Sequence, residues 1–169
     1  MPRPTIDDYA VYFDRYISQV SEDDLEQAIK NQSQILPGFL HSISEEKSLH
    51  SYAESKWTLR EVLQHLIDAE RIFNYRALCI ARKETVSLPG FDENTYAANS
   101  NGNARTWQSL LNEFMHVRTS TEDLYSSFTE EMLWQKGVSN NNVVTPLSLG
   151  FITVGHCYHH KKVIEERYL

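Results

Sequence analysis

Apolar side chains recur every three or four residues along several stretches of this chain, the spacing that gathers them on one face of a helix. The first stretch covers residues 6–43 and breaks at Val20-Ser21, where Ser21 and the acidic residues after it are typical of a new helix start. Beyond the break, one stripe contains Leu25, Ile29, Gln32, Leu36, Phe39 and Leu40. The pattern predicts a short N-terminal helix followed by a longer one.

The clearest helix start in the chain is at Thr58. Thr58 is a good N-cap, and Glu61, three residues later, can bond back to it, which makes a capping box. Trp57 and Val62 flank this pair as an apolar staple. We therefore predict a helix that begins at Thr58 and runs to about Arg82.

The remaining segments complete a bundle-like pattern. The polar connection over 89–103 is unusually long for a compact domain, so we expect it to form a wall of a functional site. A third helix is predicted over 104–127, then a Gly-, Ser- and Asn-rich loop or short hairpin over 135–144. Thr145-Pro146 indicates the start of a last helix. The chain is thus predicted to be all-α: a single domain over 1–169, folded as an antiparallel four-helix bundle with an additional short N-terminal helix.

Charge and composition exclude several classes of function. The formal net charge is −7, with acidic and basic residues interleaved, so no basic stripe is available for nucleic acid or anionic lipid. No apolar run approaches the roughly 18 residues of a membrane span, and no secretory signal is recognisable, so we expect a cytoplasmic protein. Cys79 and Cys157 lie in apolar helical segments, which indicates reduced packing residues.

Three of the seven histidines fall within five residues, and these carry the main functional signal. His156 and His160 are about 40° apart around a helix, so both imidazoles can face one ion. Their face also carries Leu149 and Ile152, which points them toward the core. Burying two imidazoles needs a partner, and a divalent metal supplies one. His65, on the predicted second helix, is the natural third ligand.

Other interpretations of these histidines stay open on the residues alone. A single core-facing histidine such as His65 is more often a hydrogen-bonded packing residue, and histidine pairs also arise by chance. His159 is a rival ligand to His160, but the two point about 100° apart, so we favour His159 as a residue that supports a ligand and the reaction or that lines the pocket. The three remaining histidines, in polar or loop surroundings, are interpreted as ordinary: His41, His50 and His116.

A few polar residues are candidates for supporting roles. Asp68, one turn after His65, would orient a ligand imidazole or assist proton transfer; the alternative is a surface residue that favours solubility. Asn94, Tyr96 and Arg105, in or just after the long connection, are candidates for the mouth of a site, each with an ordinary structural alternative.

Three stretches together resemble the DinB-like superfamily of four-helix metal-binding proteins, including its YfiT-like members. They are WTLREVLQHLIDAE at 57–70, PGFDEN at 89–94 and GHCYHH at 155–160. The resemblance implies a divalent metal, commonly zinc or nickel, held by His65, His156 and His160. These are the three histidines that the helical spacing favours.

The resemblance also bears on the reaction. Relatives include thiol-dependent transferases that use bacillithiol, mycothiol or glutathione, and others are described as metal-dependent hydrolases. We therefore expect a metal-dependent enzyme of the thiol S-transferase or hydrolase type, with a low-molecular-weight thiol as a candidate cosubstrate and a small-molecule substrate still unknown. The alternative is a non-catalytic metal-binding protein that takes part in a stress response or in an interaction with another protein. Homodimers recur among the relatives, so a homodimer is a further expectation.

Overall fold

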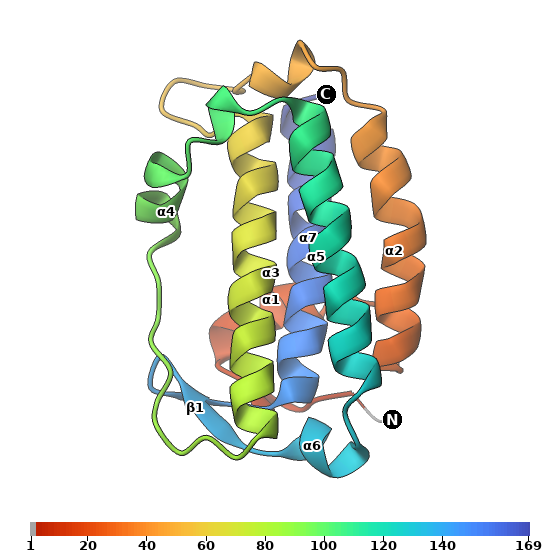
Figure 1. Cartoon of the computed structure of the whole chain (residues 1–169), viewed down its shortest axis with the longest axis vertical. Coiled ribbons are helices and arrows are strands. Elements are labelled where there is room, and N and C mark those ends of the chain that lie inside the picture. Colours follow the sequence, from red (N-terminus) through yellow and green to blue (C-terminus); the bar gives the residue numbers. More distant parts are fainter. Residues whose placement is uncertain (1–2) are drawn as a thin grey trace.

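The computed structural model describes residues 3–169, and four long helices form its body (Figure 1). They are α2 (Leu25–His41), α3 (Leu59–Ala81), α5 (Trp107–Ser126) and α7 (Pro146–Arg167). The smaller elements are η1 (Ile6–Asp8), η2 (Val11–Phe13), α1 (Asp14–Ile17), η3 (Lys47–Leu49), α4 (Glu93–Asn99), η4 (Gly102–Ala104), α6 (Glu130–Trp134), β1 (Gly137–Ser139) and β2 (Asn142–Val144). The predicted all-α four-helix bundle with a short N-terminal helix is confirmed.

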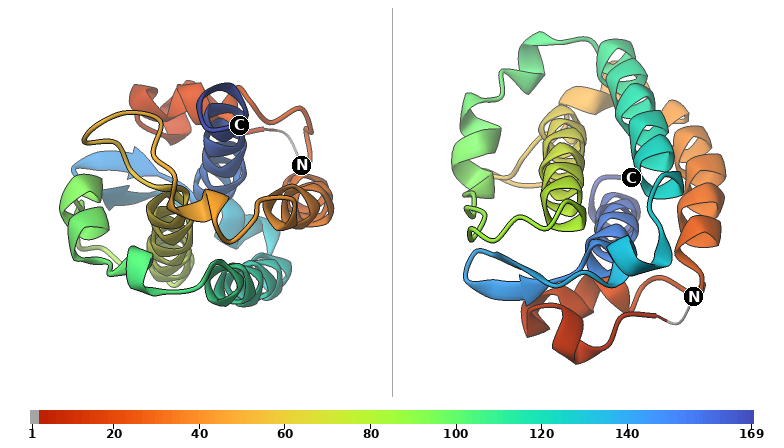
Figure 2. Two further views of the ribbon diagram at one scale, coloured as in Figure 1. Left: turned by 90° about the horizontal axis from the view of Figure 1, so that it is seen from above. Right: turned by 60° about the horizontal axis from the view of Figure 1, so that its bottom comes forward.

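The four helices form a ring in which α2 and α3, although consecutive, lie across a diagonal. Both α2 and α3 pack against α5 and α7, as the end-on view in Figure 2 shows. The predicted antiparallel packing holds for α2 with α5 and for α3 with α7. The other two neighbouring pairs run in the same direction, because the connection after α3 returns the chain to the end where α3 began.

Local capping explains where the helices begin. Thr58 Oγ1 accepts a hydrogen bond from the Glu61 backbone (3.2 Å), and Glu61 Oε2 accepts one from the Thr58 backbone (2.7 Å), which completes the predicted capping box. Thr145 caps α7 in the same way, with Pro146 as the first helical residue.

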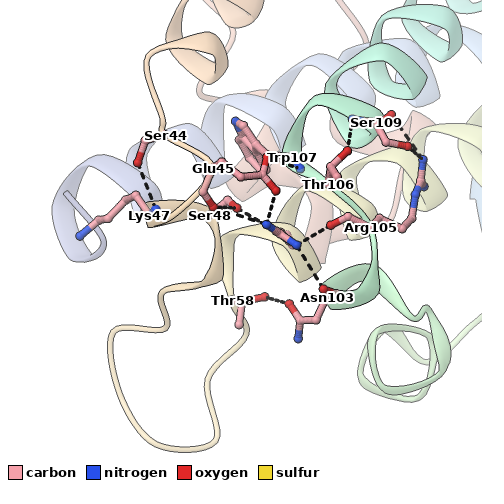
Figure 3. A network of polar contacts seen from close by, with 11 residues as sticks. Ser44, Glu45, Lys47, Ser48, Thr58, Asn103, Arg105, Thr106, Trp107 and Ser109 are labelled. Atoms are coloured by element: carbon pink, nitrogen blue, oxygen red, sulfur yellow. Dashed lines mark hydrogen bonds and ion pairs between the residues drawn. The ribbon is translucent and has the colours of Figure 1, made fainter.

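The long connection after α3 is more ordered than predicted, since it contains α4 and η4. Polar contacts tie its end to α3 (Figure 3). The Arg60 guanidinium donates to the carbonyl oxygens of Asn103 (3.2 Å) and Arg105 (2.5 Å) and to Ser48 Oγ (2.8 Å). The connection is thereby held along one side of the bundle.

A short hairpin precedes α7, as the composition of 135–144 suggested. Strands β1 and β2 pair antiparallel around Asn140 and Asn141, whose φ values of 49° and 61° suit a two-residue turn. Leu88, in the long connection, pairs with Ser139 at the edge of the hairpin. The hairpin and the connection therefore lie side by side.

The bundle interior contains a buried ion pair among its apolar side chains. Arg118 Nη2 lies 2.9 Å from Glu70 Oε2, and both side chains are almost fully buried. Cys157 lies beside them, with Sγ 3.3 Å from the same guanidinium nitrogen, and burial raises the pKa of its thiol to about 12. Both cysteines are free. None of the helices in the described part of the chain combines the length and apolar character that a membrane crossing requires.

Candidate metal centre

His65 on α3 and two histidines on α7 bring their Nε2 atoms together between the two helices. His156 Nε2 lies 3.0 Å from His65 Nε2 and 3.1 Å from His160 Nε2. The three ring centroids are 4.6–5.0 Å apart. One ligand atom from each residue therefore lies within 4.8 Å of the other two. We call these residues the histidine triad.

Burial keeps the triad in its neutral form. His65 is 8% exposed and His156 is 5% exposed, while His160 is half-buried. Desolvation lowers the pKa of His65 to about 4. The pKa values of His156 and His160 are lowered well below the usual value, first by burial and then by the neighbouring histidines. Neutral imidazole is the form that ligates a metal.

The donor set fits a divalent transition-metal ion. Nitrogens bound about 2.05 Å from a tetrahedral zinc are about 3.3 Å apart, close to the two Nε2 separations found in the triad. Three neutral Nε2 atoms also cannot all satisfy one another by hydrogen bonds, because each has either one proton or one lone pair. A cation between them would accept all three lone pairs at once.

A cavity of about 470 Å³ opens beside the triad. Its wall includes aromatic side chains from separate parts of the chain. The Tyr16 ring lies 5.2 Å from the His156 ring, and the Trp57 ring lies 5.0 Å from the His65 ring. Phe73 also lines it, with its ring 5.9 Å from that of His156. A small molecule can therefore approach the Nε2 atoms past a wall that combines these aromatic rings with polar side chains.

The sequence matches the family model of the DinB superfamily over residues 27–164. The chain belongs to the DinB superfamily. Its fold also resembles the solved structure of YfiT from Bacillus subtilis, described as a probable metal-dependent hydrolase with an unusual four-helix bundle topology. The TM-score is 0.70 at 19% identity, over 98% of this chain and 90% of YfiT. No curated protein gave a significant match.

Asp68 and His159, the two residues expected beside the ligands, lie in different places in this superfamily member. His159 lines the cavity, and its ring packs 5.3 Å from Tyr16 and 5.2 Å from His160. Asp68 is not among the described residues that line the cavity; its Oδ1 accepts a hydrogen bond from Gln64 (2.9 Å). Burial raises the pKa of the Asp68 carboxyl. Asp68 thus belongs to a polar cluster with Gln64.

The candidates from the long connection lie outside the cavity wall. Arg105 donates to Gln64 Oε1 (2.9 Å) and pairs with Glu113. The Tyr96 ring packs 5.2 Å from that of Phe91, while Asn94 is exposed. Among the described residues, the connection contributes Gly90, Phe91 and Glu93 to the cavity instead.

Several residues of the cavity wall were not anticipated from the sequence. One signal was available on α3, where His65, Ala69, Phe73 and Arg76 recur at intervals of three or four residues and so share one face. Tyr16 and Arg15 had no such signal, because the short α1 has no pattern of its own that relates it to α7.

Proposed function

We propose that this protein binds one divalent transition-metal ion on His65, His156 and His160 and is an enzyme that acts on a small molecule in the adjoining cavity. The convergence of the three Nε2 atoms at a cavity of about 470 Å³ is the observation that carries the proposal. Zinc and nickel both accept imidazole ligands, and both are candidates. The description of YfiT as a probable metal-dependent hydrolase supports the same class of chemistry.

The proposed reaction is either thiol S-transfer or hydrolysis. When bound, the ion supplies Lewis acidity that lowers the pKa of a thiol or water molecule in the cavity. The aromatic side chains of the wall place apolar groups beside the reacting atoms, which strengthens electrostatic interactions there. An S-transferase would use a low-molecular-weight thiol as cosubstrate, and a hydrolase would use water.

Two side chains beside the triad are placed to handle protons. The Tyr16 hydroxyl accepts a hydrogen bond from Arg15 (2.7 Å), and burial raises its pKa, so it remains a proton donor near neutral pH. His159 offers an imidazole at the cavity wall that can accept a proton from an incoming thiol or water. Neither residue is part of the triad, so each is available to the substrate.

Elemental analysis tests the metal site directly. We expect about one equivalent of zinc or nickel in the purified protein and a loss of most of it in the His156→Ala and His160→Ala variants. His116→Ala is the matched control, because His116 is exposed on α5. Unchanged metal content in both triad variants would refute the proposed site.

A screen for activity separates the two reaction types. Metal-loaded protein would be incubated with several low-molecular-weight thiols and electrophiles, and separately with ester and amide substrates. Thiol-dependent turnover that disappears in His160→Ala would identify a transferase, and turnover of esters or amides without thiol would identify a hydrolase. A metal-loaded protein inactive in both arms would favour the non-catalytic metal-binding alternative.

The open cavity favours the enzyme over that alternative. A metal that serves only to stabilise a fold is usually enclosed by four protein ligands. Within residues 3–169, the group of histidine, cysteine and acidic ligands that could share one ion has three members, all histidines. The site therefore has the ligand count of a catalytic centre.

A further inference from the structure

Arg76 is a buried cation at the wall of the cavity. It lies on α3, three turns beyond His65, and is 5% exposed. Desolvation lowers the pKa of its guanidinium. Nη2 donates to the Pro89 carbonyl oxygen (2.7 Å), but within residues 3–169 no carboxylate lies within ion-pair distance of this guanidinium. A buried charge without a counter-ion is unfavourable and calls for a partner.

The guanidinium is held in a fixed position relative to the triad. Its Cζ lies 6.0 Å from the Phe73 ring centroid and 5.7 Å from that of Phe91. The Phe73 ring in turn lies 5.9 Å from the His156 ring. Phe73 thus bridges the triad and Arg76 along the cavity wall.

Ser139 is a second buried polar residue at the same wall. It is 6% exposed and lines the cavity, and its buried hydroxyl has no hydrogen-bond partner among the described residues. The backbone places it near Arg76, because Ser139 pairs with Leu88, next to the Pro89 that holds the guanidinium. An oxyanion would provide acceptors for both side chains.

We propose that Arg76 and Ser139 form a subsite for an oxyanion, a carboxylate or phosphate group, at the end of the substrate that is remote from the triad. A guanidinium binds such groups through two parallel N–H donors, and a serine hydroxyl adds a third. The apolar body of the substrate lies against Phe73. This inference deepens the proposed function and rests on it only for the position of the reacting end.

The acidic residue of the cavity does not oppose this assignment. Glu93 lines the cavity, but it is exposed and does not lie within ion-pair distance of Arg76. Solvent screens an exposed carboxylate strongly. The Arg76 guanidinium is therefore available to an anion that enters the cavity.

Calorimetry on the metal-free protein near neutral pH tests the subsite without the metal. The probes are benzoate, phenylphosphonate and the neutral isostere benzamide. We expect both anions to bind, with a dissociation constant at least about tenfold larger in Arg76→Gln and about threefold to tenfold larger in Ser139→Ala. Benzamide should bind more weakly than the anions, and the tighter of the two anions identifies carboxylate or phosphate as the natural group.

Arg71→Gln is the matched control. Arg71 lies on the same helix but is half-exposed and pairs with Glu113 (2.5 Å) outside the cavity. Anion binding that persists in Arg76→Gln, or that falls equally in Arg71→Gln, would overturn the subsite. If Arg76→Gln fails to fold, the Ser139→Ala variant provides the test, because this substitution removes no hydrogen bond between described residues. Unchanged anion affinity in Ser139→Ala would also overturn the proposed subsite. Metal content is measured in the same variants, so that a failure of the anion subsite can be distinguished from a failure of the metal site.

Discussion

Gly155 on α7 and Tyr16 on α1 are in such close contact that a Cβ atom added to Gly155 would lie 2.0 Å from the Tyr16 carbonyl oxygen. No residue other than glycine fits there without moving α1. Because Gly155 precedes His156, this approach also brings the Tyr16 ring to 5.2 Å from the His156 ring. The absence of a side chain at Gly155 therefore lets α1 lie close against α7 at the edge of the cavity.

Replacing this glycine should displace α1. We expect Gly155→Ala to lower the free energy of unfolding by about 2–3 kcal/mol, the upper range for overpacking, since the clash is with backbone. Gly38→Ala is the control: a Cβ there meets nothing within 4 Å, and helix propensity predicts a gain of about 0.5–1 kcal/mol. Denaturant unfolding measures both. Equal stability of Gly155→Ala and the wild type would contradict this packing.

Metal binding should stabilise the folded protein, because the triad exists only when α3 and α7 are packed. At a free metal concentration a thousandfold above the dissociation constant, the gain is about 4 kcal/mol. We expect thermal unfolding to shift to higher temperature when zinc or nickel is added to metal-free protein, and the shift to vanish in His65→Ala. His116→Ala should keep it. A shift of equal size in both variants would mean that the metal binds elsewhere.

The metal-free protein should lose stability in mild acid. The pKa of His65 is about 4 in the folded state against an ordinary value of 6.5, so the unfolded chain binds the proton more readily. The neutral His65 side chain therefore makes its full contribution to the free energy of unfolding above pH 6.5, and this contribution is lost as the pH falls toward 4. For His65 alone, the loss between pH 8 and pH 5 is about 2 kcal/mol.

Denaturant unfolding at these two pH values, with metal removed, measures the loss. His65→Gln should reduce the pH dependence, whereas His116→Gln, which changes an exposed residue, should leave it unchanged. If His65→Gln shows the full wild-type dependence, the buried neutral imidazole is not its source.

The Glu70–Arg118 pair should be sensitive to the loss of one partner. Arg118→Met leaves the Glu70 carboxylate buried without its cation, and we expect a loss of about 3–5 kcal/mol in the free energy of unfolding. Lys162→Met is the control: its pair with Glu166, at 3.8 Å, is exposed on both sides and should contribute less than about 1 kcal/mol. Comparable losses in the two variants would show that burial does not make the Glu70–Arg118 pair more sensitive than an exposed one.

Much of the fold could be predicted from the sequence, because the signals are local. The capping box at Thr58 and the Thr145-Pro146 start are set by residues three or four positions apart, and the structure has both. Helix periodicity alone put His156 and His160 on one inward face. The convergence of His65 with them agrees with the resemblance to the DinB superfamily.

The sequence by itself determined the four long helices, the starts of α3 and α7, and which two imidazoles of α7 face the same side, since each depends on neighbours within one or two turns. Only the tertiary structure decided that α3 and α5 run in the same direction and that Tyr16 lies beside His156 at the wall of the cavity. These features depend on which faces meet across the bundle, and contacts between residues far apart in the chain leave no period in the sequence.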